Sequence, residues 1–383
     1  MPHFEKMLYD NALLIMAYSV AYSLTQNHIY LDTAVKTADY IQREMTSAEG
    51  GFFCAQDADS EGVEGKYYTF TLDEIMTVFG DKGQRFAEVF DITEHGNFGG
   101  KNIPNLLKSS DLPSGFDDEL QKLYEYRRSR TELRLDDKIL LSWNAIMCAA
   151  MSMLYRVTNN KKYLRSAERA QEFIERNMSD VTMLFASFRK GGHSEQAFLD
   201  DYAYYVAALI EIYNSTLDGY YIELAERFCK EAVRRFADGN GGFNMCESNE
   251  LFMNPKELYD GAAPSGNSVM AYDLVRLYQL TGKDIYREYA EKQIAFMTES
   301  TQDYPAGNCM FLLAKLMYEV PPSHITVAVK GTDNLSEIRL PFLANVSAQQ
   351  TNEQCPLLNN RTTYYICRGN MCLPPVNEIA PKR

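Results

Sequence analysis

Nearly uncharged helical stretches alternate with charged helices along this chain. Four of the charged helices open on a Tyr that is followed four residues later by an Ala: Tyr30/Ala34, Tyr163/Ala167, Tyr221/Ala225 and Tyr286/Ala290. Repeats of this length indicate stacked helical hairpins, none of which can bury its apolar face alone. The first interval is about twice as long as the next two, which predicts one or two degenerate hairpins between the first pair and the second.

The two helices of each hairpin differ in charge. Asn11–Leu24 contains no charged residue, whereas Tyr163–Arg176 contains six. A helix that is apolar on all sides is buried on all sides, and a helix with a charged stripe faces water. We therefore expect an all-α toroid, with buried inner helices, amphipathic outer helices and a cavity at one end. The expected inner helices are Asn11–Leu24, Ala145–Val157, Tyr202–Tyr213 and Asn267–Leu280, whose only charges are Arg156, Glu211, Asp273 and Arg276.

The pattern changes at Pro321. His324–Lys330 and Thr363–Cys367 are short runs rich in β-branched and aromatic residues, which is typical of strands. The sequence therefore predicts two parts, a helical barrel over residues 1–320 and a small α/β or β appendage over residues 321–383.

Composition and charge argue against several kinds of partner. The 383 residues carry a formal net charge of −14, which argues against nucleic acid or an anionic membrane surface. The most hydrophobic run, Ile139–Tyr155, is interrupted by polar residues and is too short to span a bilayer. The first residues show no basic and apolar leader pattern, so we expect a cytoplasmic protein. The eight cysteines show no Cys/His zinc spacing, and we expect no metal and no cofactor.

The segments that join one hairpin to the next carry the unusual side chains. In antiparallel hairpins these segments all lie at one end of the barrel, so their polar residues gather over the cavity. Carboxylates, amides and aromatic rings placed there suit a small, sugar-like ligand. The candidates for acid and base catalysis are Asp57, Asp137 and Asp201. The candidates for substrate binding are Asp10, Asp59, Trp143, Asn144, Tyr202, Asp260, Ser265 and Asn267.

Helix capping is the alternative role for several of these residues. Asp, Asn and Ser at a helix start commonly accept hydrogen bonds from free main-chain N–H groups. Adjacent residues at a helix start point about 100° apart, so Asp200 and Asp201 cannot cap the same groups. We expect Asp200 to cap its helix and Asp201 to project over the cavity. Cys367 and Cys372 are expected to be ordinary buried thiols rather than metal ligands or a redox pair.

Five ordered motifs resemble one known family. They are Pro2–Ala12, Gln56–Gly62, Leu141–Asn144, Phe198–Ala203 and Pro264–Ser268. Together they resemble the spermatogenesis-associated thioredoxin-domain proteins and their bacterial relatives, from residue 1 to the Cys367–Cys372 segment. The resemblance implies an (α/α)6 barrel of the six-hairpin glycosidase type, related in fold to N-acylglucosamine 2-epimerases. Family members usually begin with a thioredoxin-like domain, which we expect to be absent here because the first matching motif starts at Pro2.

Two classes of function follow from this sequence. The first is a carbohydrate-active or carbohydrate-binding barrel; an enzyme of this kind would be glycosidase-like or a sugar isomerase or epimerase. The related epimerases use histidines on barrel helices, and no such pair occurs among the five histidines here. The second is a non-enzymatic scaffold that partners a thioredoxin-like domain. Two carboxyl groups facing each other across the cavity would favour glycosidic chemistry, whereas carboxylates bound to main-chain N–H groups would favour the scaffold.

Overall fold

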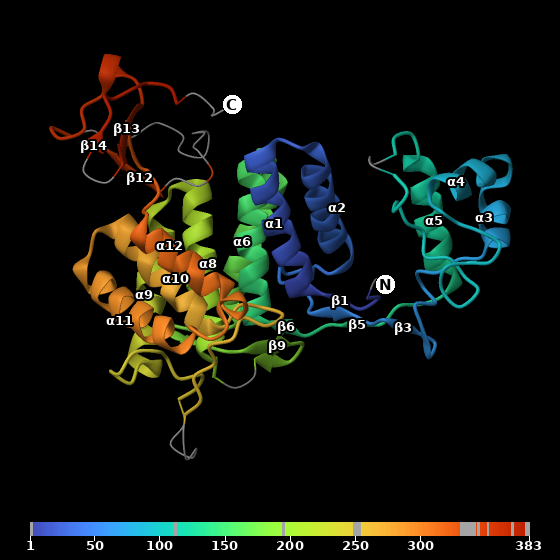
Figure 1. Ribbon diagram of the computed structural model, residues 1–383, viewed down its shortest axis with the longest axis horizontal. Helices are drawn as coiled ribbons and strands as arrows, with labels where there is room; N and C mark the ends of the chain where they lie inside the picture. Colours follow the sequence, from blue (N-terminus) through green and yellow to red (C-terminus); the bar gives the residue numbers. More distant parts are fainter. Residues whose placement is uncertain are drawn as a thin grey trace.

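The computed structural model describes residues 3–109, 113–193, 196–247, 254–329, 342, 345–350, 352–368 and 371–379. Its long helices form antiparallel hairpins (Figure 1). The pairs are α1 (Leu8–Thr25) with α2 (His28–Glu44), α6 (Leu141–Thr158) with α7 (Lys161–Asn177), α8 (Leu199–Thr216) with α9 (Gly219–Phe236), and α10 (Gly266–Thr281) with α11 (Asp284–Ser300). A further helix, α12 (Cys309–Glu319), packs against α10.

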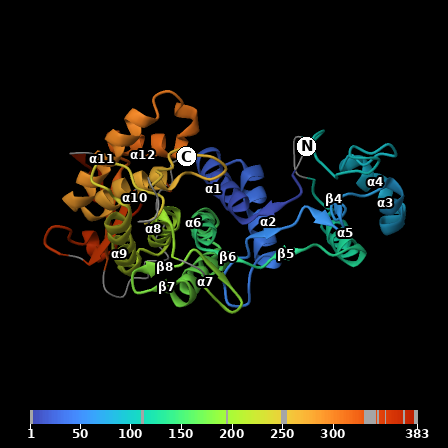
Figure 2. The ribbon, with the colours of Figure 1, turned by 90° about the horizontal axis from the view of Figure 1, so that it is seen from below.

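The hairpins are arranged around a common axis. Helix α6 packs between α1 and α8, and α10 packs between α8 and α12. Seen along these helices in Figure 2, α1, α6, α8, α10 and α12 follow an arc, with α2, α7, α9 and α11 outside it. The fold is therefore an all-α toroid of the (α/α)6 type, as the sequence predicts.

A repeated turn joins each inner helix to its outer helix. A Thr at the end of the inner helix donates its hydroxyl to the carbonyl four residues earlier and accepts the N–H two residues later. The residue between adopts the left-handed conformation, and the next residue is the N-cap of the outer helix. The four Thr residues are Thr25, Thr158, Thr216 and Thr281. This turn keeps the two helices of every hairpin in one register.

Burial around the ring is uneven. Helices α6, α8 and α10 are buried on nearly all sides. The expectation that Asn11–Leu24 is also buried on all sides is wrong, because only Leu8, Ala12, Ile15 and Ser19 of α1 are buried. The reason is that α1 lies at one end of the arc and packs against an inner helix, α6, on one side.

A separate subdomain interrupts the first repeat. Helices α3 (Leu72–Phe79), α4 (Gly83–Val89) and α5 (Asp117–Arg130) and the 3-10 turn Gly80–Lys82 surround their own core of Phe79, Phe86, Phe90 and Phe116. We call residues 57–134 the satellite. The expectation of degenerate hairpins in this interval is therefore wrong, since these aromatic residues pack on one another and not on the ring.

Short strands hold the satellite and the hairpin connections. Strand β2 (Ala55–Gln56) pairs with both β1 (Lys6–Met7) and β5 (Leu135–Asp136), so the two ends of the satellite lie side by side. Strand β3 (Asp59–Ser60) pairs with β4 (Val63–Glu64) inside the satellite. In the next connection β9 (Ser187–Arg189) pairs with β6 (Ile139–Leu140) and β10 (Gly192–His193), and β7 (Ser179–Asp180) pairs with β8 (Met183–Leu184).

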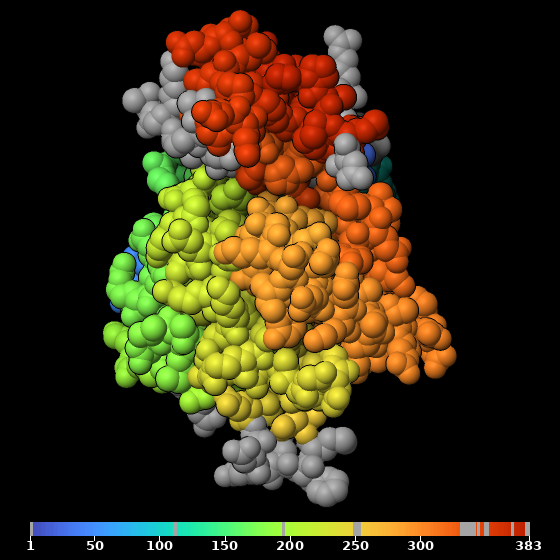
Figure 3. All heavy atoms as spheres, turned by 90° about the vertical axis from the view of Figure 1, so that its left-hand side faces the viewer, coloured from blue at the N-terminus to red at the C-terminus, as the bar shows by residue number. Residues whose placement is uncertain are grey.

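The C-terminal residues form a mixed four-stranded sheet. Its order is β12 (Asn345–Gln350), β11 (His324–Val329), β13 (Thr363–Arg368) and β14 (Met371–Cys372), and β11 is parallel to β12 and antiparallel to β13. Apolar residues of β11 pack on the ends of α8 and α10, and Figure 3 shows this appendage seated on one end of the ring.

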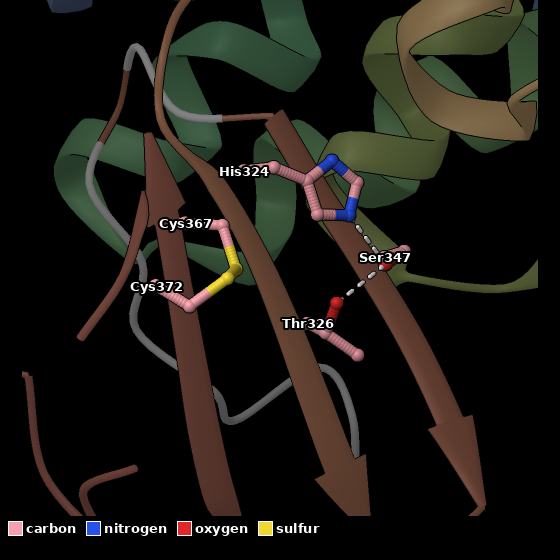
Figure 4. The surroundings of a disulfide bond; sticks show 5 residues. All are labelled: His324, Thr326, Ser347, Cys367 and Cys372. Carbon is pink, nitrogen blue, oxygen red and sulfur yellow. Dashed lines mark hydrogen bonds between the residues drawn. A yellow bond between two sulfur atoms is a disulfide. The ribbon is translucent and has the colours of Figure 1, made fainter. Parts of the chain in front are cut away.

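Two cysteines of the appendage are linked. The register of β13 and β14 places Cys367 directly opposite Cys372, and the two form a disulfide (Figure 4). The expectation of two ordinary buried thiols is wrong, because the short hairpin between them brings both sulfurs to one face of the sheet.

Candidate functional site

The connections that follow α2, α7 and α9 are each held by the next inner helix. The Phe52 N–H donates to Asn144 Oδ1 at 2.7 Å, and Asn144 Nδ2 donates back to the Phe52 carbonyl at 2.9 Å. Phe243 and Asn267 make the same pair of bonds, at 2.7 and 2.9 Å. In the hairpin between them, the Leu184 N–H donates to the Tyr202 hydroxyl at 3.1 Å. Three successive connections are thus fixed at the same point.

These bonds decide where three predicted ligand-binding residues lie. Asn144, Tyr202 and Asn267 have no exposed surface, and the Tyr202 hydroxyl also donates to the Thr182 carbonyl at 3.1 Å. Their polar groups are directed to the main chain of neighbouring segments, because that main chain is buried and needs partners. The structure therefore places them as positioning residues, in a different role from the ligand contacts that the sequence suggests.

The adjacent acids Asp200 and Asp201 join α8 to both neighbouring inner helices. Asp201 accepts hydrogen bonds from the N–H groups of Ser142 at 3.1 Å and Phe198 at 2.9 Å. The Asp200 carboxyl lies against Gly266, at the start of α10. The expectation that Asp201 projects over the cavity is wrong, because only 4% of Asp201 is exposed and both oxygens are engaged. Burial raises the pKa of each carboxyl to about 6.

A similar link joins α10 to α12. Asp260 accepts the N–H groups of Ser265 at 2.9 Å and Met310 at 2.8 Å. Ser265 is the N-cap of α10 and accepts the Ser268 N–H at 3.2 Å. Both predicted binding residues thus serve helix starts.

The remaining predicted residues are spread over the connections and α1. Asp57 accepts the Asp59 N–H at 3.2 Å in a local turn where the satellite begins, and Asp59 itself is exposed. The exposed Asp137 forms an ion pair with Arg189, whose Nη2 lies 2.6 Å from Asp137 Oδ1. The half-buried Trp143 packs edge-on against Tyr9, with ring centroids 4.8 Å apart. Asp10 is exposed on α1. A role of Asp57 or Asp137 in proton transfer stays a prediction.

A cavity of about 300 Å³ lies inside the ring. This volume falls at the small end of the range of ligand pockets, about 300–1,000 Å³. Its walls are mostly apolar and come from α1, α6, α8, α10 and α12, with Leu13, Met16, Met153, Val269 and Met310 among them. The eleven predicted residues are not among those that line this cavity, because they belong to the connections rather than to the middle of the inner helices.

Polar side chains from three inner helices meet at this cavity. Arg156 of α6 forms an ion pair with Glu211 of α8, with Nη1 and Oε2 3.2 Å apart. Asn214 Nδ2 donates to the second oxygen of Glu211 at 3.2 Å, and Arg276 Nη2 of α10 lies 3.5 Å from Asn214 Oδ1. With Tyr272 of α10, these five residues line the cavity, and we call them the polar cluster.

The appendage borders the polar cluster. Arg156 Nη2 donates to the Phe342 carbonyl at 2.5 Å, and the guanidinium stacks on the Phe342 ring. Arg276 donates to the side-chain oxygen of Asn345, at the start of β12. The sheet therefore contributes to the end of the cavity at which the polar cluster lies.

Donors exceed acceptors in the polar cluster. It contains two guanidinium groups and one carboxylate, and Arg276 Nε is buried without a hydrogen-bond partner in the described part of the chain. Burial and the neighbouring Arg276 lower the pKa of Arg156, against the opposing effect of Glu211. Burial raises the pKa of Tyr272 to about 12, which keeps its hydroxyl protonated as a further donor. A ligand rich in oxygen acceptors complements this arrangement. The sequence does hold a signal for the cluster, since its three charged members are exceptions within nearly uncharged helices.

A second, wider cavity of about 720 Å³ separates the satellite from α2. Two cations of the ring side lie on tyrosine rings of the satellite: Lys6 Nζ is 4.1 Å from the Tyr68 centroid, and the Arg43 guanidinium of α2 is 4.7 Å from that of Tyr124. Burial and Arg127 lower the pKa of Lys6 to about 8. These contacts join the satellite to the ring.

Two further features bear on the site. The described residues contain no group of three or more His, Cys, Asp or Glu side chains placed to hold a metal ion. Across the same residues, none of the helices combines the length and the hydrophobicity that crossing a membrane requires.

Solved structures identify the class of fold. A sugar epimerase from a ruminal bacterium superimposes with a TM-score of 0.50 at 12% identity, over 79% of this chain and 62% of the epimerase. A family 76 α-mannanase of Bacteroides thetaiotaomicron gives a TM-score of 0.45 at 13% identity, over 77% of this chain and 62% of the mannanase. The ring and its central cavity thus place the chain in the class of (α/α)6 toroids, whose fold the sugar epimerase shares. Likeness at this level of identity establishes the fold alone.

Sequence comparison identifies the particular relatives. Human spermatogenesis-associated protein 20 is 30% identical over an alignment of 460 positions, gaps included, which covers 98% of this chain and 57% of the human protein. An uncharacterized protein of Caenorhabditis elegans is 26% identical over an alignment of 440 positions, gaps included, which covers 99% of this chain and 60% of the nematode protein. No family model matches the chain. The chain is a homologue of spermatogenesis-associated protein 20, and it spans less than two thirds of the length of these relatives.

Proposed function

We propose that this toroid binds a small polyhydroxylated ligand, of the sugar-acid class, in its central cavity. The observation that carries the proposal is the polar cluster, in which two arginines, one carboxylate, a tyrosine and an amide meet in an otherwise apolar wall. Ligand pockets commonly combine apolar walls with a few convergent polar groups. A carboxylate or several hydroxyl oxygens on the ligand would complement the excess of donors.

The members of the cluster suit distinct contacts. Arg156 and Arg276 would donate to a ligand carboxylate, because guanidinium forks match that geometry. Glu211 would accept a ligand hydroxyl, and the ring of Tyr204, which lines the same cavity, would lie against an apolar sugar face. Glu211 is the only carboxylate among the lining residues that the structure describes. Binding is therefore better supported than hydrolysis by two opposed carboxylates.

A thermal-shift screen tests this proposal. The probes are gluconate and glucuronate, compared with glucose and N-acetylglucosamine at equal concentration. We expect the two acids to raise Tm, because a ligand that binds only the folded state stabilises it by mass action. Arg276→Met and Glu211→Gln should remove the shift, and Arg287→Met, on an exposed part of α11, should retain it. Equal responses to all four compounds, or shifts that survive both cluster variants, would contradict the proposal.

A second candidate function is a scaffold for a thioredoxin-like partner. The observation that favours it is that Asp57, Asp201 and Asp260 each accept main-chain N–H groups, as expected of residues that hold connections in place. Titration calorimetry with a purified thioredoxin-like domain tests it. Measurable binding that Arg276→Met leaves unchanged would support the scaffold, and the absence of heat at micromolar concentrations would argue against it.

A further inference from the structure

We infer that the edge of the ring formed by α1 and α12 is an interaction surface for one further helical hairpin whose second helix ends in a Gly-Gly-aromatic loop. Such a partner is of the same repeat type as the hairpins of this chain. The inference rests on the surfaces of α1 and α12 and on a hydrogen-bonding position at Asn11, and it is independent of the proposed ligand.

Both end helices of the arc expose apolar stripes. On α1, Leu14 and Leu24 are 47% and 66% exposed, and Ala17 and Ala21 lie between them at helical spacing. On α12, Leu312, Leu313 and Leu316 are 39%, 45% and 57% exposed. These stripes differ from α6, α8 and α10, whose surfaces are covered by neighbours on both sides.

The two stripes border one space. Other residues of the same helices, Leu13 and Met16 of α1 and Met310 and Met317 of α12, line the central cavity together. Leu313 both lines that cavity and is exposed. A helix seated between α1 and α12 would therefore cover both stripes and add a wall to the cavity.

The side chain of Asn11 indicates which kind of main-chain segment would bind at this edge. Helices α1 and α6 start alike, each with a Leu after a two-residue strand and an Asn three residues later. Asn11 Nδ2 donates to the Met7 carbonyl at 2.7 Å, and Asn144 Nδ2 donates to the Leu140 carbonyl at 2.9 Å. In the described part of the chain, however, no main-chain N–H donates to the Asn11 oxygen, whereas the Asn144 oxygen accepts Phe52.

The loops that the equivalent amides bind have a common sequence. Asn144 binds the Phe of Gly50–Gly51–Phe52, and Asn267 binds the Phe of Gly241–Gly242–Phe243. A Cβ at Gly51 would lie 2.8 Å from Ile139 Cδ1 and 3.0 Å from the Phe173 ring, and a Cβ at Gly242 would lie 2.4 Å from Phe296 Cε1. Asn11 occupies the same position of its helix as Asn144. By analogy it would bind a Gly-Gly-aromatic loop, which a hairpin preceding α1 around the ring would supply.

The order of packing supports this placement. Each of α2, α7 and α9 contacts its own inner helix and also the next inner helix, α6, α8 and α10 respectively. An incoming outer helix would contact α1 in the same way. The curated relatives are longer than the stretch that this chain matches, so a segment of this kind can come from chain outside the match.

A fused copy of an existing hairpin tests the surface. Residues 199–247, which contain α8, α9 and the Gly241–Gly242–Phe243 loop, are placed ahead of residue 3. A Gly/Ser linker of about ten residues reproduces the span between Phe243 and Asn267. We expect a higher Tm and weaker binding of the dye ANS, because the exposed stripes become covered. Asn11→Ala should cancel the rise in Tm in the fused protein and leave the Tm of the original chain unchanged.

Two outcomes would overturn the inference. The first is a fused copy that changes neither Tm nor ANS fluorescence. The second is an Asn11→Ala effect that is equal in the fused and original chains. The double variant Leu14→Glu/Leu316→Glu of the original chain gives an independent check. It should fold with unchanged Tm and bind less ANS, and a large fall in Tm would show that the stripes are already packed.

Discussion

Asp273 shows what burial does to one carboxyl group in this fold. It lies on α10 with no exposed surface, and neither of its oxygens has a hydrogen-bond partner within the described residues. Burial raises its pKa well above the ordinary value of 3.8, because the charged form loses its hydration. The folded protein therefore favours the neutral acid.

The pH dependence of stability should report this group. The unfolded chain ionises Asp273 near pH 3.8, whereas the folded chain resists ionisation, so its contribution to stability is present at low pH and is lost as the pH rises toward the folded pKa. Asp273→Asn removes this loss. We expect a gain in Tm that is near zero at pH 4 and at least about 2 °C at pH 8, since one unit of pKa corresponds to about 1.4 kcal/mol.

An exposed acid provides the comparison. The side chain of Asp284 is 70% exposed and pairs with Arg287, and Asp284→Asn should give a small Tm change that does not grow with pH. A gain for Asp273→Asn that stays constant from pH 4 to pH 8, measured by calorimetry, would contradict a neutral buried acid.

Single polar residues were only partly predictable. Asp, Asn and Ser side chains at helix starts accept hydrogen bonds in the same way whether the donor belongs to a ligand or is a main-chain N–H. Asn144 and Asn267 could therefore be recognised as special, but their partners, Phe52 and Phe243, lie in connections that become neighbours only after the ring forms. Which of Asp200 and Asp201 contacts which neighbouring helix likewise depends on where Ser142 and Gly266 lie in space.

At the scale of elements, the connections should be as important for stability as the helices. Asn144→Ala or Asn267→Ala removes both partners of a buried main-chain N–H and C=O. We expect each substitution to lower the free energy of unfolding by about 1–3 kcal/mol, the cost of an unsatisfied buried group. Urea denaturation measures this.

Asn11→Ala is the matched control for these substitutions. Asn11 makes the same bond to the carbonyl four residues earlier but binds no connection in the described chain. It should change stability by less than about 0.5 kcal/mol. Equal losses at all three positions would mean that the shared bond within the helix start, and not the link to the connection, provides the stability.

Element identity was largely predictable, because charge contrast separates buried from exposed helices. Helix α1 was the exception, since an uncharged sequence such as Asn11–Leu24 indicates that its surface should be covered but cannot show whether the covering segment is present. The repeated Thr turn was also available in the sequence. Its recognition required aligning the hairpins at their turns rather than at the Tyr/Ala pairs.

At the scale of the whole molecule, the chain builds a ring, a sheet at one end of it and a satellite beside it. The ring was predictable from periodicity. The satellite was not, because weak helical patterns such as Leu72–Phe79 look the same in a degenerate repeat and in an independent core. The division between them is set by Phe86 and Phe116, which pack on each other.

The pairing of β2 with β5 means that the barrel is continuous in space although it is interrupted in sequence. Gln56 lies opposite Leu135. Residues 58–133 are therefore an insertion between two paired strands, and a two-residue Asn-Gly turn could replace them. We expect the shortened protein to fold cooperatively and to retain the far-ultraviolet dichroism of the remaining helices. Loss of cooperative unfolding in calorimetry would show that the ring needs the satellite. Retention would show that the ring folds without the satellite, so that a segment of this size can be removed between β2 and β5 while the arrangement of the inner helices is kept.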